Sequence, residues 1–508
     1  MVTDRARSAH SSAAPPPRWW RALYALLWAA LLWLVANAVY VYIVLGGQRI
    51  YRLEAATVIF IALLLPVVLA NGRRVPPALM ASERLATGLL ALVLVLILST
   101  YVPLLAFPFL SDDYVFLSRY KTLADAVHGP QFFRPLYNVV YMVLAKLGAG
   151  SSVPFHVASL GLHLGSGVLV YRLARRLFDA NGPALVAFAV FVLNPLQAEA
   201  VLWASGLQDA LWTVFLLAAL TCYTAAPRLT FRAAWSTTAL IALALLSKES
   251  AVCFIILLPA ADGFLFRWRR GPALLPTYAF FATMLCAYLL LRASIVPMEA
   301  GYFVPPTRYF LTKFVTAPYR FFVQPWNVSA IAMPPVLACA LTVVVAVLVF
   351  RTVVHQRTGA RLLVGPAVIF LSTLPVYSYF FVSAELTGAR YLYFPAFGWA
   401  LLLAELSLSA ISSGPAIGLT VAALALGQTA LLHVNLAPWR VAGAFVEYLA
   451  AGIRAGRPAD TLVEEWQQRT GIALTVEGGV PRSYQGVGIF INGSPEFMQV
   501  TRGATLRR

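Results

Sequence analysis

Residues 84–114 have the sequence RLATGLLALVLVLILSTYVPLLAFPFLSDDY. Between Arg84 and the acids at the end, the run holds no charged side chain. It is long enough to cross a bilayer, because a spanning helix needs about 20 apolar residues. Two adjacent acids, Asp112 and Asp113, follow it directly. The stretch therefore predicts a membrane-spanning helix that brings two carboxylates to one membrane surface.

Runs of the same kind recur along the chain. Of its 508 residues, 60% are hydrophobic and 11% are charged, whereas a soluble domain carries roughly 25% charged residues. At about 20 residues per crossing, the sequence predicts an all-α polytopic membrane protein with about thirteen transmembrane helices. The predicted spans are 19–46, 54–72, 84–106, 155–177, 182–199, 206–224, 234–248, 250–265, 272–294, 333–350, 362–383, 389–410 and 414–434. The pair 234–248 and 250–265 is short, and a re-entrant hairpin is the alternative there.

The distribution of arginine predicts the orientation of these spans. Alternate short connections are basic, as in Arg172, Arg175 and Arg176, and cytoplasmic loops carry an excess of Lys and Arg. The net charge of +18 is spread singly between apolar runs, so no nucleic-acid partner is expected. The four cysteines lie inside apolar runs without metal-ligand or disulfide spacing.

This orientation divides the chain into a cytoplasmic tail, a membrane domain and a small extracytoplasmic region. The predicted boundaries are 1–18, 19–434 and 435–508. Two long external connections, 107–154 and 295–332, mix aromatic residues, prolines and isolated charges, which predicts short interfacial helices. Within the C-terminal region, residues 472–500 have strand character broken by Gly478-Gly479 and Asn492-Gly493, which predicts a small hairpin.

Ionisable residues at the outer ends of the spans are the candidates for chemistry, because such groups are costly at membrane depth. Asp112 and Asp113 repel each other, and such pairs commonly supply general bases. The alternative is a pair of solvated loop acids. Lys248 and Arg390 could clamp a phosphate. Their alternatives are snorkelling to lipid headgroups and, for Lys248, pairing with Glu249.

For two further positions, the sequence does not decide between a functional and a structural role. His163 lies on the fourth predicted span, two turns after His156, and could hydrogen-bond a sugar. A buried structural histidine is the alternative, and no trio of ligands at metal spacing accompanies it. Arg134, followed by Pro135, is either a functional cation or an anchor of the external loop.

Taken in order, six segments resemble the GT-C superfamily of lipid-donor glycosyltransferases. The resemblance is strongest to the transmembrane and tetratricopeptide-repeat protein O-mannosyltransferases and their bacterial relatives. The segments are Ser111-Asp112-Asp113-Tyr114, Phe133-Arg134-Pro135-Leu136, Phe155-His156 with Leu162-His163, Asn194-Pro195-Leu196-Gln197-Ala198-Glu199-Ala200-Val201, Leu246-Ser247-Lys248-Glu249 and Ala389-Arg390-Tyr391-Leu392-Tyr393-Phe394-Pro395.

The resemblance implies a GT-C-like bundle and a set of roles. Asp112 would be the catalytic base with Asp113 as its partner, or the reverse, and Lys248 and Arg390 would face the donor phosphate. Both acids could also hold a divalent cation, Mg²⁺ or Mn²⁺. The implied substrate-binding residues are Arg134, His163, Glu199, Asp209, Glu249, Tyr391 and Tyr393.

The implied reaction moves a sugar from a polyprenyl-phosphate donor to a hydroxyl of a protein, glycan or lipid acceptor. Inversion at the anomeric carbon is expected for a single displacement. The expected location is a bacterial inner membrane, with the site facing the periplasm or exterior. Asn194-Pro195 replaces a usual His-Pro, and Leu207-Gln208-Asp209 lacks an expected arginine. The alternatives are a transporter or lipid flippase, and a non-catalytic relative of the same fold.

Overall fold

The computed structural model describes most of the chain from residue 83 onward. The described ranges are 83–127, 132–225, 230–266, 275–296, 316–317, 319–321, 324–330, 364–374, 381–410 and 414–501, without the side chains of 263–266 and 408–417. The predicted tail 1–18 and the predicted spans 19–46, 54–72 and 333–350 lie outside these residues, as does most of the predicted connection 295–332.

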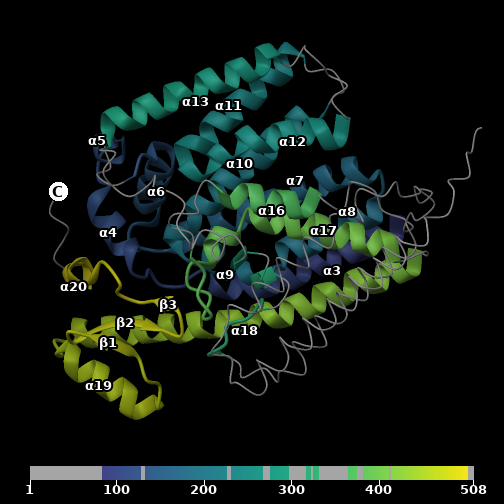
Figure 1. The fold of residues 1–508 in the computed structure, drawn as a ribbon. Helices are drawn as coiled ribbons and strands as arrows, with labels where there is room; N and C mark the ends of the chain where they lie inside the picture. Colours follow the sequence, from purple (N-terminus) through teal and green to yellow (C-terminus); the bar gives the residue numbers. More distant parts are fainter. Residues whose placement is uncertain are drawn as a thin grey trace, which may run out of the picture. The chain divides into compact units, whose positions relative to one another are not determined.

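The described residues are mostly helical (Figure 1). Five helices are long and apolar enough to cross a membrane, and a bent pair raises the number to six. The five include α3 (Glu83–Tyr101), α7 (Val153–Phe178), α10 (Leu207–Tyr223) together with the turn before it as Ala204–Tyr223, α13 (Leu275–Ile295) and α18 (Gly414–Arg454). A helical protein rich in membrane-span candidates is therefore confirmed for this part of the chain. The total of about thirteen spans stays a prediction.

The remaining helices of the bundle are shorter. They are η1 (Val102–Leu104), α8 (Asn181–Val192), α9 (Ala198–Leu202), α11 (Phe231–Ser247), η4 (Glu249–Cys253), α12 (Phe254–Phe266), α16 (Val364–Thr373), η8 (Ala389–Leu392) and α17 (Pro395–Ala410). α8 is apolar on all sides and buried from Gly182 to Val192, so it forms the core against α7 and α17. α16 and α17 meet backbone to backbone at Gly365 and Gly398, where a Cβ on either would lie 2.5 Å from the other's carbonyl oxygen.

The predicted span 182–199 is not one straight helix. It bends by 40° between α8 and the segment that begins at Pro195. Proline lacks the N–H that would continue the helical ladder, and the Asn194 side chain instead accepts a hydrogen bond from Leu196 N at 3.0 Å. Two short turns follow, η2 (Pro195–Gln197) and η3 (Ala204–Gly206), on either side of α9. The bend places Glu199 on a short helix beside the start of α10.

The connection 107–154, predicted to be external, contains α4 (Asp112–Arg119), α5 (Leu123–Val127) and α6 (Pro135–Gly148). α4 begins at the acidic pair, and α6 begins directly after Arg134. The loop therefore has helical structure of its own, as the sequence predicts.

The chain does not break at the predicted boundary 434/435. α18 continues to Arg454 through Pro438, because its apolar face continues at helical spacing through Leu436, Trp439, Val446 and Leu449, all of which are buried. Residues 435–454, the first part of the predicted extracytoplasmic region, are therefore the end of α18.

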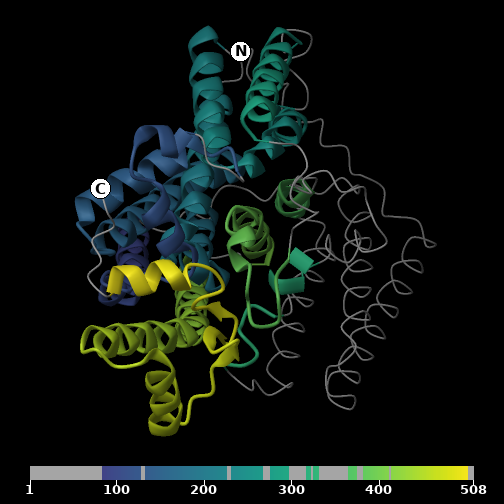
Figure 2. The same cartoon turned by 90° about the vertical axis from the view of Figure 1, so that its left-hand side faces the viewer.

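A small C-terminal unit, residues 459–501, follows α18 (Figures 1 and 2). It consists of α19 (Ala459–Thr470), β1 (Thr475–Glu477), β2 (Val480–Tyr484), β3 (Val487–Gly488) and α20 (Ser494–Thr501). The strands form an antiparallel sheet in the order β1-β2-β3. Gly478 and Gly479 make the predicted turn with positive φ angles of 59° and 77°. The second predicted turn, at Asn492-Gly493, leads into α20 and not into a strand.

Candidate active site

The two acids at the start of α4 have different environments. Asp113 is 1% exposed, and both its oxygens accept hydrogen bonds: Oδ2 from Leu110 N at 2.9 Å, and Oδ1 from Ser205 N at 2.7 Å and from the Ser205 hydroxyl. Burial raises the pKa of Asp113 to about 7, although these hydrogen bonds oppose the shift. Asp113 thus ties the connection 107–154, which we name the acidic loop, to η3.

Asp112 is half-buried and faces the C-terminal unit. Its Oδ1 accepts a hydrogen bond from Asn492 Nδ2 at 2.6 Å. A helix N-terminus also favours negative charge at this position. Of the two acids, Asp112 is the more accessible.

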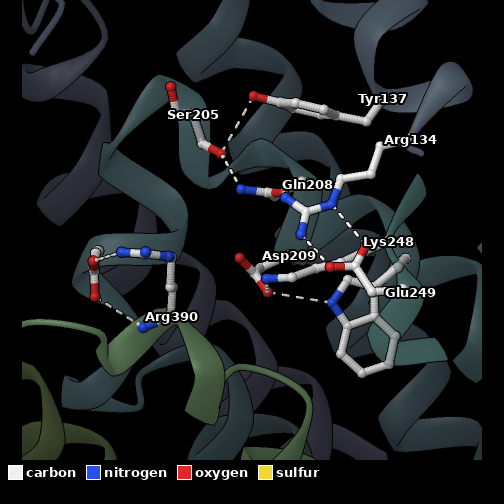
Figure 3. Close-up of polar contacts among 10 residues, drawn as sticks. Arg134, Tyr137, Ser205, Gln208, Asp209, Lys248, Glu249 and Arg390 are labelled. Atoms are coloured by element: carbon white, nitrogen blue, oxygen red, sulfur yellow. Dashed lines mark hydrogen bonds and ion pairs between the residues drawn. The ribbon is translucent and has the colours of Figure 1, made fainter. Parts of the chain in front are cut away.

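Three ion pairs, Arg134–Glu249, Lys248–Asp209 and Arg390–Glu199, form what we name the ion-pair cluster (Figure 3). Arg134 binds Glu249 through two nitrogens, with Nε 2.8 Å from Oε2. Lys248 Nζ lies 2.5 Å from Asp209 Oδ1. Arg390 donates to Glu199 from its guanidinium and from its backbone N, the latter to Oε2 at 3.0 Å.

Aromatic rings bring the cations of the cluster together. The ring of Tyr391 has Lys248 Nζ and Arg390 Cζ each 5.0 Å from its centroid. Arg390 Cζ also lies 4.9 Å from the ring of Trp203. Cations over aromatic faces at such distances are attracted by the ring quadrupole. The predicted convergence of Lys248 and Arg390 is therefore present in the described residues.

The pairing within the cluster differs from the alternative drawn from the sequence. Lys248 does not pair with its neighbour Glu249, because the extended backbone of Lys248 (φ −162°, ψ 136°) sends the two side chains to opposite sides. Lys248 meets Asp209, and Glu249 meets Arg134. Snorkelling of Lys248 to lipid headgroups is also wrong, because its side chain is only 2% exposed.

Ser205 connects the acidic loop to the ion-pair cluster. Its backbone N and hydroxyl donate to Asp113, and its carbonyl accepts from Gln208 Nε2 at 3.1 Å. Gln208 Oε1 in turn accepts from Arg134 (Figure 3). A second link runs from Trp203 Nε1 to the carbonyl of Leu110, at 3.2 Å. The acids and the cluster thus belong to one hydrogen-bonded assembly.

The three cations differ in accessibility. The side chain of Arg390 is 22% exposed, that of Arg134 10% and that of Lys248 2%. Each cation faces one carboxylate, so the cluster as a whole is close to neutral. Arg390 is therefore the cation of the cluster that an arriving anion reaches most easily.

His163 and Tyr393 occupy the core. His163 is 0% exposed, and its ring nitrogens contact the Tyr393 hydroxyl at 2.8 Å and the carbonyl of Val192 at 2.9 Å. Tyr393 is equally buried. Their contacts are those of a structural pair between α7 and the end of η8, and their predicted contact with substrate stays a prediction.

The resemblance also implies that Asp112 and Asp113 hold a divalent cation. In the part of the chain that the structure describes, no group of three or more His, Cys, Asp or Glu side chains could hold a metal ion. Both oxygens of Asp113 are occupied by hydrogen bonds from Leu110 and Ser205. Asp112 and Asp113 as placed here do not form a site for Mg²⁺ or Mn²⁺.

Ser205, Trp203 and Asn492 were not predicted as site residues, and Asn492 was noted only for the turn that it makes with Gly493. Each lies at the site only because the fold brings it there. Leu207 stands where the resemblance leads us to expect an arginine, two residues before Asp209. The neighbouring Gln208 links Arg134 and Ser205 through its amide.

The fold and the site together describe a helical membrane protein with an acidic loop joined to a buried ion-pair cluster. In a comparison with known proteins, the chain is 24% identical over 296 residues to a Caenorhabditis elegans protein named protein O-mannosyl-transferase F38B6.6. The similarity covers 54% of this chain and 42% of that protein, so the chain matches less than half the length of the relative. No family model and no solved structure matches the chain.

Proposed function

We propose that this chain is an integral-membrane glycosyltransferase of the GT-C type. It would transfer a sugar, mannose being the first candidate, from a polyprenyl-phosphate donor to a hydroxyl acceptor on the extracytoplasmic side. Similarity to a protein named as an O-mannosyl-transferase supports the reaction class. The observation that carries the proposal is the contact chain from Asp113 through Ser205 and Gln208 to Arg134, which joins an acidic loop to the ion-pair cluster.

Asp112 is the base in this proposal. Hydrogen bonds to Leu110 and Ser205 engage Asp113 and leave Asp112 as the accessible carboxylate of the pair. Asp112 takes the proton of the acceptor hydroxyl, and the acceptor oxygen attacks the anomeric carbon. The bond from that carbon to the phosphate oxygen breaks, and the polyprenyl phosphate leaves. Asp113 holds the loop in place.

Arg390 receives the donor phosphate. It is the most exposed cation of the cluster, and guanidinium binds phosphate bidentately. Lys248 is held by the buried carboxylate of Asp209, and Arg134 by the half-buried carboxylate of Glu249. Both cations contribute positive charge to phosphate binding without leaving these partners. Fixed charges of this kind stabilise a departing phosphate more strongly where water is scarce.

The test is a transfer assay on the purified protein in lipid vesicles. The donor is radiolabelled mannosyl-phosphopolyprenol, and a pool of Ser/Thr-containing peptides is the acceptor. Asp112→Asn should lower turnover by about 100-fold or more, the usual contribution of a general base. Asp125→Asn, which changes an exposed acid in the same loop, is the matched control and should stay near the wild-type rate.

Two outcomes contradict the proposal. Full turnover in Asp112→Asn removes this residue from the mechanism. Movement of the labelled lipid across the vesicle membrane without any glycosyl transfer favours the transporter alternative.

A further inference from the structure

The chain segment 489–493 lies directly against the acidic loop. Ser111 N donates to the carbonyl of Ile489 at 2.8 Å, and Asn492 N donates to Ser111 Oγ at 3.3 Å. The side chain of Asn492 reaches Asp112, with Nδ2 2.6 Å from Oδ1. Residues nearly 400 positions apart in the sequence thus share the neighbourhood of the proposed base.

The segment is held firmly enough to fix that contact. Arg482 Nη1 donates to the carbonyls of Phe490 and Ile491, at 3.1 and 3.2 Å. The rings of Phe490 and Phe497 pack on each other and on Tyr114 of α4, with centroids 4.6 to 6.3 Å apart. Figure 1 shows the resulting position of α20 beside α4.

Gly493 allows the close approach. Its φ angle is +78°, in the region that favours glycine, and a Cβ there would lie 2.5 Å from the carbonyl oxygen of Ser111. A side chain at this position would push the segment away from the acidic loop. The backbone therefore sets the distance between Asn492 and Asp112.

We propose that the C-terminal unit completes the acceptor side of the site, and that Asn492 is a positioning residue for Asp112; this rests on the proposed function. The Asn492 amide fixes the rotation of the carboxylate by holding Oδ1. Oδ2 is then the oxygen that takes the proton from the acceptor hydroxyl. A carboxylate held in one orientation needs no rearrangement before proton transfer.

The test uses the full-length protein in the vesicle assay, with mannosyl-phosphopolyprenol as donor and water or the peptide pool as acceptor. Asn492→Leu keeps the size of the side chain and removes the donor. Asn492→Asp keeps its size and polarity, and places a like charge against Asp112. Thr387→Val is the control, because it removes another hydrogen bond between the unit and the bundle, from Thr387 Oγ1 to the carbonyl of Gly486 at 2.9 Å.

Both Asn492 variants should lower kcat by about tenfold or more, the loss expected for one hydrogen bond to a charged group. The KM for the donor should stay unchanged, because Asn492 acts on the base and not on the phosphate. Thr387→Val should keep the wild-type kcat. Thermal melting of all variants shows whether the C-terminal unit stays folded.

The inference is overturned if either Asn492 variant keeps the wild-type kcat. It is also overturned if Thr387→Val lowers kcat as much as Asn492→Leu does, because the segment would then act by docking alone. A wild-type protein that releases no mannose refutes the proposed function itself and removes the basis of the inference. The two failures are therefore distinguishable.

Discussion

The ion pair between Lys248 and Asp209 should dominate the stability of the site. Both side chains are 2% exposed and lie 2.5 Å apart. In Lys248→Met the Asp209 carboxylate stays buried without its cation and keeps the hydrogen bond from Trp212 Nε1 at 3.3 Å. Removing one partner of a buried pair typically costs 3 to 5 kcal/mol, so we expect a loss of about 4 kcal/mol in the free energy of unfolding.

Equilibrium unfolding in mixed micelles, followed by tryptophan fluorescence, measures this loss. The double variant Lys248→Met/Asp209→Leu should recover most of it, because replacing both charges with apolar side chains is often close to neutral. Asp209→Leu alone should cost a similar amount, because it leaves Lys248 buried without its anion, so the two single losses should add up to much more than the loss in the double variant. Arg457→Met breaks the exposed Arg457–Glu465 pair and should barely change stability, which makes it the matched control.

A loss below about 1 kcal/mol in Lys248→Met would refute this reasoning, because that is the value of a solvated pair. Lys248 would then be open to solvent or ligand. The assignment of Arg390 as the main phosphate contact would lose its support at the same time.

Two further results are expected. Asp113 holds a proton in the folded protein up to a pKa of about 7, while the unfolded carboxyl releases it near 3.8, so stability should fall as the pH rises from about 4 to 7. In Asp113→Asn the free energy of unfolding should depend less on pH across that range. An unchanged pH dependence would contradict the burial of the acid. In a cysteine-free background, Lys121→Cys and Arg175→Cys should react with an impermeant thiol reagent from opposite sides of a vesicle, and labelling from one side would overturn the orientation.

The sequence predicts the helices of the described bundle well. A long apolar run has no other way to satisfy its backbone in a membrane, so composition and length suffice to predict a helix. The bend at Asn194-Pro195 was not predicted, although proline and an asparagine cap were both visible. The continuation of α18 past 434 was missed because the mean polarity of the chain rises there while one helical face stays apolar.

The candidate site was predictable in its members but not in its pairing. Acids and cations at the predicted outer ends of spans are visible in the sequence, and three cations near them meet in one cluster. The pairing of each cation with its carboxylate depends on backbone angles, such as the φ and ψ of Lys248. The contact of Asn492 with Asp112 depends on how the C-terminal unit docks, and no local pattern encodes that.

The neutrality of the ion-pair cluster constrains how the proposed donor binds. A phosphate that approaches Arg390 must compete with Glu199 for the guanidinium. Glu199 does not become an orphaned buried charge when it loses that contact, because its Oε2 keeps the hydrogen bond from the backbone N of Arg390 at 3.0 Å. The exchange therefore replaces one anion with another at the guanidinium and leaves the Lys248–Asp209 and Arg134–Glu249 pairs intact. Glu199 stays hydrogen-bonded to Arg390 with and without a bound phosphate, because the side chain and the backbone N of Arg390 contact the carboxylate independently.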